Sequence, residues 1–207
     1  MLDMMASDAG SIRVFLGLGA VRVRPRMYIG DTEDGTGLHN MVLATVSYAL
    51  RERSGRCAGC IRVCLDADGS CTVSDDGPGL SGEPGSGGEI SELEAAMTRL
   101  DPKDLAGGVE QTGLCVVNAL SYWLQIESRI GGTSFDLAFR HGVQLSPLGI
   151  RAITDDHCGT TISFQPSADT FPERSFNGAR LKADLEALSL RSGARIELKD
   201  ARGNPAT

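Results

Sequence analysis

The sequence predicts an α+β fold, with one largely antiparallel sheet and helices on one of its faces. Helical patterns flank a cluster of consecutive strand-like runs in the middle of the chain, which is the order expected of such a fold. The chain has 207 residues, of which 41% are hydrophobic, so its composition is that of a globular protein with a buried core. We expect residues 11–200 to form a single domain, residues 1–10 a flexible N-terminal segment and residues 201–207 a flexible tail.

The individual elements follow from hydrophobic periodicity and from turn residues. Apolar residues three and four positions apart predict a helix over Leu38–Leu50, and Ser54 and Gly55 end it. Cys60–Asp66 and Ser70–Ser74 are strand-like, and the Ala-Asp-Gly between them is typical of a hairpin. The remaining expected elements are helices at Ser11–Val23, Ile90–Leu100, Gly113–Leu120 and Leu181–Leu188, and strands at Trp123–Ile130, Thr133–Arg140, Gly159–Gln165 and Ala194–Lys199.

Charge and hydropathy exclude several classes of protein. The chain has 20 Lys and Arg against 27 Asp and Glu, a net charge of −7, which makes it a poor candidate for a clamp on the DNA backbone. No apolar run approaches the roughly 18 residues that a membrane span needs. The N-terminus has no basic segment followed by an apolar stretch, as a secretory signal would. We therefore expect a cytoplasmic protein with no membrane contact and no direct handling of DNA.

The six cysteines raise the question of a metal site or disulfides. Cys57 and Cys60 have the spacing of half a zinc site, but no second pair of Cys or His residues completes it. Cys60, Cys64 and Cys71 fall where the hairpin would place buried apolar side chains. We expect free, buried thiols in a reducing compartment and no bound metal.

Ordered motifs carry more information than the elements do. Val21–Thr32 leads into Asp34–His39, Ser74–Gly79 ends a strand, and Cys115–Ser121 forms a helix. Together with Gly159–Thr160, their order and spacing resemble the ATPase domain found in the B subunits of DNA gyrase and topoisomerase IV, which belongs to the GHKL group and has the Bergerat fold. The resemblance covers nearly the whole chain, and it is an argument for the fold rather than for the activity.

The resemblance implies an adenine- or purine-type pocket. In the family, an aspartate in a D-x-G-x-G loop accepts a hydrogen bond from the adenine amino group, and Asp75, Gly77 and Gly79 match that motif. Thr160 matches the threonine that supports the aspartate, whereas Pro78 stands where the family commonly has an arginine that stacks on adenine. The same Asp, Gly and Pro residues also favour a plain strand-to-loop turn. The other residues that the resemblance assigns to the pocket are Ser47, Leu80, Gly108 and Gly113.

The same resemblance predicts that hydrolysis has been lost. The family's signature helix carries a Glu that activates water and, four residues later, an Asn that binds Mg²⁺. Alignment on the Gly-Thr-Gly-Leu-His motif places Ala44 at the Glu position, Tyr48 at the Asn position and Asn40 where a His is usual. Alanine cannot accept a proton, and a neutral phenol is a poor ligand for Mg²⁺. We therefore expect neither ATP hydrolysis nor Mg²⁺ binding.

The phosphate-binding segment also departs from the family. The family presents Gly-x-His-Gly-x-Gly before a helix, where backbone amides bind phosphates. Here the segment runs from Gly108 to Gly113, Gln111 replaces the middle glycine, and Glu110 adds a negative charge. The preceding lid is shorter than in the family, and Lys103 is its one candidate cation.

The sequence is compatible with three functions. The first is a pseudo-ATPase that binds ATP, ADP or another adenine-like ligand weakly and serves as a ligand-binding or regulatory module. The second is a protein-interaction module that pairs with the B subunit of gyrase or mimics it. The third is a new reaction in the former ATP cavity, with Tyr48, Glu110 or Cys115 as the reacting groups. Topoisomerase activity is not expected of this chain alone, since the family's transducer and Toprim domains have no counterpart in it.

Overall fold

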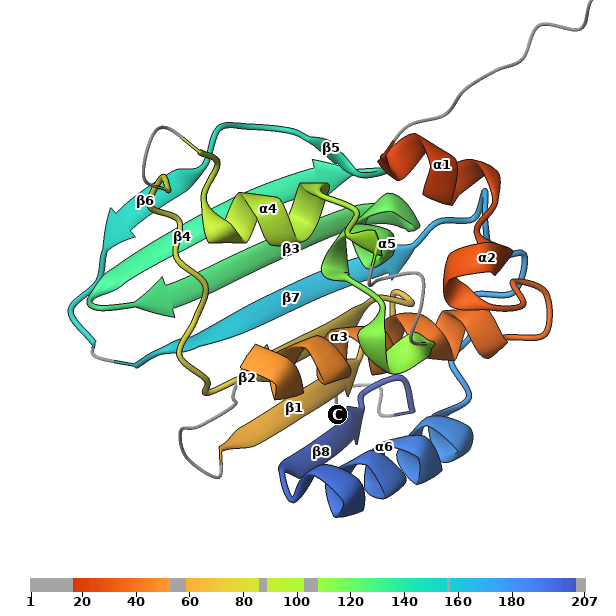
Figure 1. Ribbon diagram of the computed structural model, residues 1–207. Helices are drawn as coiled ribbons and strands as arrows, with labels where there is room; N and C mark the ends of the chain where they lie inside the picture. The colour runs from red at the N-terminus through yellow and green to blue at the C-terminus, as the bar shows by residue number, and fades with distance from the viewer. Residues whose placement is uncertain (1–16, 53–58, 86–88, 103–107, 156, 204–207) are drawn as a thin grey trace, which may run out of the picture.

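A mixed sheet of eight strands forms the centre of the molecule (Figure 1). The computed structural model describes residues 17–52, 59–85, 89–102, 108–155 and 157–203. The strands are β1 (Cys60–Leu65), β2 (Cys71–Asp75), β3 (Ser121–Ile130), β4 (Thr133–Arg140), β5 (Val143–Gln144), β6 (Gly149–Ala152), β7 (Gly159–Pro166) and β8 (Arg195–Asp200). Their order is β5-β4-β3-β7-β2-β1-β8, and β6 also pairs with β4. Every pair is antiparallel except β1 with β8.

Helices cover one face of this sheet. They are α1 (Leu18–Val23), α2 (Arg26–Ile29), α3 (Thr36–Glu52), α4 (Glu92–Thr98), the 3-10 turn η2 (Val109–Gln111), α5 (Leu114–Ala119) and α6 (Gly178–Ser192). In Figure 1, α3, α4 and α5 lie over the same side of the strands. The strands alternate accordingly: in β7, Ile162 and Phe164 are buried, while Thr161 and Ser163 beside them are half-buried. The predicted α+β class is thus confirmed.

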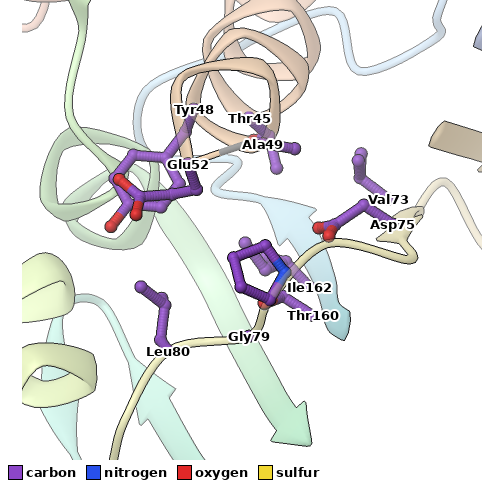
Figure 2. Close-up of a pocket in the computed structure, with 11 residues that line it drawn as sticks. Thr45, Tyr48, Ala49, Glu52, Val73, Asp75, Gly79, Leu80, Thr160 and Ile162 are labelled. Atoms are coloured by element: carbon purple, nitrogen blue, oxygen red, sulfur yellow. The ribbon is translucent and has the colours of Figure 1, made fainter. Parts of the chain in front are cut away.

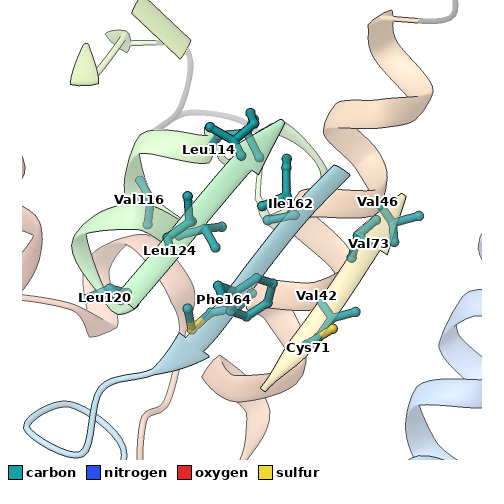
Figure 3. Close-up of a cluster of buried hydrophobic side chains, with 14 of the residues drawn as sticks. Val42, Val46, Cys71, Val73, Leu114, Val116, Leu120, Leu124, Ile162 and Phe164 are labelled. Atoms are coloured by element: carbon teal, nitrogen blue, oxygen red, sulfur yellow. The ribbon is translucent and has the colours of Figure 1, made fainter. Parts of the chain in front are cut away.

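Helix α3 is the main element between the sheet and the other helices. Its start is fixed by Asp34, whose Oδ1 accepts a hydrogen bond from the Thr36 amide at 2.8 Å. The next helical residue is Gly37, which has no side chain to clash with the preceding loop; a Cβ there would lie 2.7 Å from the Asp31 carbonyl oxygen. Further along, Val42 and Val46 are completely buried, and Figure 3 shows them beside the side chains of β2. The Gly-Thr-Gly-Leu-His motif therefore begins a helix that packs directly on the sheet.

The predicted hairpin forms between β1 and β2. Its turn is held by Asp68, whose Oδ1 accepts hydrogen bonds from the Ser70 amide at 2.9 Å and from the Ser70 hydroxyl at 2.6 Å. Gly69 has a φ of +80°, which a glycine adopts without strain. Leu65, the last residue of β1, pairs with Cys71, the first residue of β2.

The thiol prediction is only partly right. Cys71 and Cys115 are buried, but Cys60 and Cys64 are half-buried and Cys158 is exposed. The reason for Cys60 and Cys64 is the strand period of two: the buried residues of β1 face the helices, so these two thiols lie on the opposite face. All five of these cysteines are free thiols. Cys57 lies outside the described residues.

The other elements agree with the sequence except at the chain's start and at one sheet edge. Within the described residues the first helix begins at Leu18, later than predicted, and residues 11–16 lie outside them. The sequence pattern does not predict α2, β5 and β6, which have only two to four residues each. Such short elements carry too little periodicity to be recognised.

Candidate functional site

A pocket lies where the C-terminal half of α3 faces strands β2 and β7 (Figure 2). Each neighbouring element contributes side chains to its wall. The lining residues are Thr45, Tyr48, Ala49 and Glu52 of α3, Val73 and Asp75 of β2, Pro78, Gly79 and Leu80 of the following loop, and Thr160 and Ile162 of β7. Five residues assigned to the pocket from the sequence therefore lie together in its wall: Asp75, Pro78, Gly79, Leu80 and Thr160.

The loop after β2 is fixed by hydrogen bonds to three side chains. The Gly77 amide donates to Asp75 Oδ1 at 2.7 Å, which orients the carboxylate at the end of the strand. The Asp76 carboxylate accepts from the Cys60 amide, with both oxygens at 3.0 Å. The hydroxyl of buried Ser128 accepts from the Leu80 amide at 2.6 Å and donates to the Leu80 carbonyl at 2.8 Å. This side of the pocket is therefore held in place by the protein's own contacts.

Two glycines allow this loop to approach the neighbouring strands. Gly79 has a φ of +78°, and a Cβ there would overlap the carbonyl oxygen of Arg129 on β3. Gly159 has a φ of +145°, and a Cβ there would overlap the carbonyl oxygen of Asp75. Both positions thus require glycine for steric reasons as well as for backbone conformation.

The pocket is nearly filled by its own side chains. The room left for the centre of a water molecule is about 10 Å³, which is about enough for one water. Figure 2 shows Tyr48 and Glu52 next to each other on the α3 side, opposite Asp75. The guanidinium of Arg51 lies 5.4 Å from the centre of the Tyr48 ring, in a cation–π contact. A purine therefore needs side chains of the wall to move before it can enter.

The other residues assigned from the sequence lie outside this wall. Ala44 is completely buried in the core. Ser47 is 4% exposed, and its hydroxyl has no hydrogen-bond partner within the described part of the chain. Asn40 Nδ2 donates to the Ile29 carbonyl at 2.8 Å, which links α3 to α2. Gly108 precedes η2, and Gly113 precedes α5. Gly77 lies in the loop after β2 but is not part of the wall.

The segment at the family's phosphate-binding position folds as a closed turn. The Gln111 amide donates to the Gly108 carbonyl at 3.0 Å, and the Thr112 amide donates to the Val109 carbonyl at 3.1 Å. Arg51 of α3 donates to the carbonyl of Glu110 and to that of Thr112, the latter at 3.4 Å. On its outer side, the Glu110 carboxylate pairs with Arg191 of α6 at 2.6 Å. Two backbone amides of this segment are thus already bonded within the turn.

Sequence reasoning does not identify three residues that have clear roles at the site. Helical spacing puts Glu52 two turns beyond Ala44 and out of its reach, but Glu52 lines the pocket beside Tyr48. Arg51 holds η2, and an exposed arginine at a helix end carries no signal for such a contact. Ser128 does carry a signal, because a serine at a buried position of an alternating strand needs hydrogen-bond partners there.

Neither a metal cluster nor a membrane span occurs among the residues that the structure describes. No group of three of their His, Cys, Asp or Glu side chains is arranged to hold a metal ion. No helix in the same part of the chain is long and apolar enough to cross a bilayer.

Comparison with known proteins gives a consistent result. No family model matches the chain. The DNA gyrase B subunit of Rickettsia conorii is 38% identical over 203 residues, which covers 94% of this chain and 25% of the relative. The Caulobacter vibrioides protein is 38% identical over 213 residues, and the Thermotoga maritima protein is 34% identical over 202 residues, with 26% and 31% of their lengths covered. The chain thus spans about a quarter of the length of the first relatives it matches, and it is a homologue of the N-terminal part of the B subunit of DNA gyrase, with the mixed α+β architecture of a GHKL domain.

Proposed function

We propose that this domain binds a purine-type ligand without hydrolysing ATP and acts as a ligand-binding or regulatory module. The observation that carries the proposal is the composition of the pocket wall. Asp75 and Thr160 lie in it together, whereas Tyr48 occupies its α3 side. The residues that would recognise a base are thus present, and the residues that would activate water and hold a metal are replaced.

The loss of hydrolysis rests on two positions of α3. Ala44, at the position of the family's general base, has no group that can accept a proton, and its side chain is completely buried. Tyr48, at the position of the Mg²⁺ ligand, offers a neutral phenol instead of an amide oxygen. These two residues do not fit Mg²⁺. Among the α3 residues of the pocket wall, Glu52 has a carboxylate, so a Glu52→Gln variant tests whether it replaces the missing base.

The test is a binding and turnover measurement on the whole chain. Calorimetric titration with adenosine, ADP and a non-hydrolysable ATP analogue, with and without Mg²⁺, is expected to detect binding of at least one of them. Asp75→Ala is expected to weaken that binding at least about tenfold, because it removes the acceptor for the base. Asp169→Ala is the matched control, since its carboxylate is exposed and lies outside the pocket wall. Circular dichroism verifies that both variants fold.

Two outcomes would overturn this function. One is Mg²⁺-dependent phosphate release from ATP that disappears in Asp75→Ala or in Glu52→Gln. That result would make the protein an ATPase, with Glu52 in place of the missing base. The other is the absence of binding by every purine tested.

A second candidate, a protein-interaction module, is favoured by one surface. The edge strand β5 and the residues around it expose apolar side chains: Val143 is 65% exposed, Leu145 59% and Tyr122 40%. Exposed apolar side chains at a free sheet edge are typical of a contact surface. When the purified gyrase B protein is mixed with this chain, a complex is expected in sedimentation experiments. The double variant Val143→Ser, Leu145→Ser is expected to weaken that complex, whereas Asp75→Ala leaves it unchanged.

A further inference from the structure

A second, larger cavity lies beside the pocket and shares part of its wall. Its volume is about 360 Å³, against about 10 Å³ for the pocket. It lies among the end of α3, helix α4 and the start of α5. Tyr48 and Glu52 belong to both walls. A ligand that extends from the pocket past these two side chains therefore enters the second cavity. Its lining residues are Tyr48, Arg51, Glu52, Glu92, Ala95, Ala96, Arg99, Asp101, Gly113 and Leu114.

The charged side chains that the structure describes in this second cavity have a small excess of negative charge, and Lys103 of the predicted lid lies outside the described residues. Among the described lining residues, three carboxylates (Glu52, Glu92 and Asp101) stand against two guanidinium groups (Arg51 and Arg99). A phosphate chain would carry further negative charge into this partly enclosed space, where screening by water is reduced.

Two backbone amides of the turn beside the cavity are already bonded within that turn. Phosphates bind where several backbone amides are unbonded and point at the same spot. The amides of Gln111 and Thr112 are instead bonded within η2, at 3.0 and 3.1 Å. Arg51, which could turn towards an anion, donates to the carbonyls of Glu110 and Thr112 and lies over the Tyr48 ring. A phosphate that bound through the amides of η2 or through Arg51 would have to break these contacts first.

We propose that the ligand of this site is an uncharged purine base or nucleoside, bound in preference to its phosphorylated forms. This rests on the proposed function above, because it specifies the chemical class of the same ligand. The base occupies the pocket beside Asp75 once side chains of the wall move, and the sugar extends past Glu52 into the second cavity. The domain thereby discriminates by charge between a nucleoside and its nucleotide, which have the same base.

The test is a titration of the whole chain, followed by NMR, with adenine, adenosine, AMP and ATP at matched ionic strength. Adenosine is expected to bind at least about tenfold more tightly than AMP or ATP. AMP or ATP binding as tightly as adenosine would overturn this inference and leave the purine pocket intact. If none of the four purines binds, the proposed function fails, and the inference fails with it. Raising the salt concentration is expected to narrow the difference between adenosine and AMP.

Charge variants identify the source of the discrimination. Glu52→Gln retains the size of the side chain that both cavities share and removes its charge, so the ratio of AMP to adenosine affinity is expected to rise about threefold or more. The matched control is Glu186→Gln on α6, a 65% exposed carboxylate that pairs with Lys182 at 3.9 Å and lies outside the pocket wall. An equal change in both affinities, or the same rise in the control, would show that the carboxylates of this cavity do not set the preference.

Discussion

The two halves of the site differ in what holds them. We call the loop after β2 and the start of β7, where the proposed base would bind, the base side. Ser128 fixes this loop, and the loop packs so closely on β3 and β7 that Gly79 and Gly159 have no room for a side chain. We call Gly108–Gly113, which corresponds to the family's phosphate-binding segment, the phosphate side. Its turn η2 is closed by hydrogen bonds of its own amides and by Arg51 of α3. The base side is thus built into the sheet, whereas the phosphate side is a short turn that is held by its own amides and by one side chain of α3.

This difference changes how the retained motif is interpreted. The glycines of the loop and of the Gly-Thr pair are required by backbone packing, so their presence would be explained even if no ligand bound. Asp75 and Thr160 are the more informative residues, because their side chains reach the pocket wall. Substitutions can test this difference: those on the base side are expected to lower the stability of the whole domain more than those on the phosphate side.

The largest effect is expected at Gly159 on the base side. Gly159→Ala would place a Cβ against the Asp75 carbonyl at a φ of +145°, so both sterics and backbone conformation oppose it. We expect the free energy of unfolding to fall by about 3 kcal/mol or more, measured by urea denaturation.

The matched control for that variant is Gly69→Ala in the hairpin turn. Gly69 also has a positive φ, of +80°, but a Cβ there would meet nothing within 4 Å. Its cost is therefore conformational only, about 1 kcal/mol. If the two variants lose the same stability, the close approach of Gly159 to Asp75 contributes nothing, and the base side is less tightly packed than we infer.

The next largest effect is expected at Ser128. Ser128→Ala removes the hydroxyl that bonds both the amide and the carbonyl of Leu80 in a buried place. Because the Leu80 groups lose their partner, the free energy of unfolding is expected to fall by about 2 kcal/mol. Ser128→Thr, which retains the hydroxyl, is expected to recover part of it. A loss below about 0.5 kcal/mol would mean that the loop is held mainly by other contacts.

Much of this arrangement could be predicted from the sequence, and the exceptions have physical reasons. The long helix α3 and the hairpin carry strong periodic and turn signals, and both form where expected. The grouping of Asp75, Pro78, Gly79, Leu80 and Thr160 followed from a motif resemblance, not from periodicity. The narrowness of the pocket could not be predicted, since it depends on how the side chains of its wall pack in three dimensions. The contact of Arg51 with η2 joins residues 59 positions apart, which no local pattern can indicate.

On the phosphate side, a smaller effect is expected from Arg51→Met. The variant removes the hydrogen bonds to the carbonyls of Glu110 and Thr112 in a largely exposed region. The free energy of unfolding is therefore expected to fall by at most about 1 kcal/mol. Hydrogen exchange at the Gln111 and Thr112 amides is expected to become faster, because η2 opens locally.

The control for this variant lies on the other face of the sheet. Arg62→Met removes an exposed guanidinium that pairs with Glu197 at 3.8 Å, and it is expected to leave exchange in η2 unchanged. Unchanged exchange at Gln111 and Thr112 in Arg51→Met would instead show that the turn closes without help from α3. In that case η2 would be held by its own hydrogen bonds alone, and the contact with Arg51 would not distinguish the phosphate side from the base side.

The smallest effect on stability is expected near the start of α3, the helix that contacts both the base side and the phosphate side of the site. His39 is 3% exposed, and its Nε2 accepts a hydrogen bond from the Asn177 amide at 2.9 Å, which requires a neutral ring. Burial, and then the positive charge of Arg180, lower the pKa of His39 below its usual 6.5. The unfolded chain therefore binds a proton more readily than the folded one, so this contribution to stability is complete above pH 6.5 and is lost as the pH falls through the lowered value.

Urea midpoints between about pH 7.5 and pH 5 are expected to show a modest decrease, which disappears in His39→Gln because glutamine does not titrate. The carboxylates whose pKa is also lowered, such as Asp34 and Asp200, act in a separate window, at and below their ordinary value of 3.8. An equal decrease in His39→Gln would assign the pH dependence to other groups and leave the α3 start insensitive to His39.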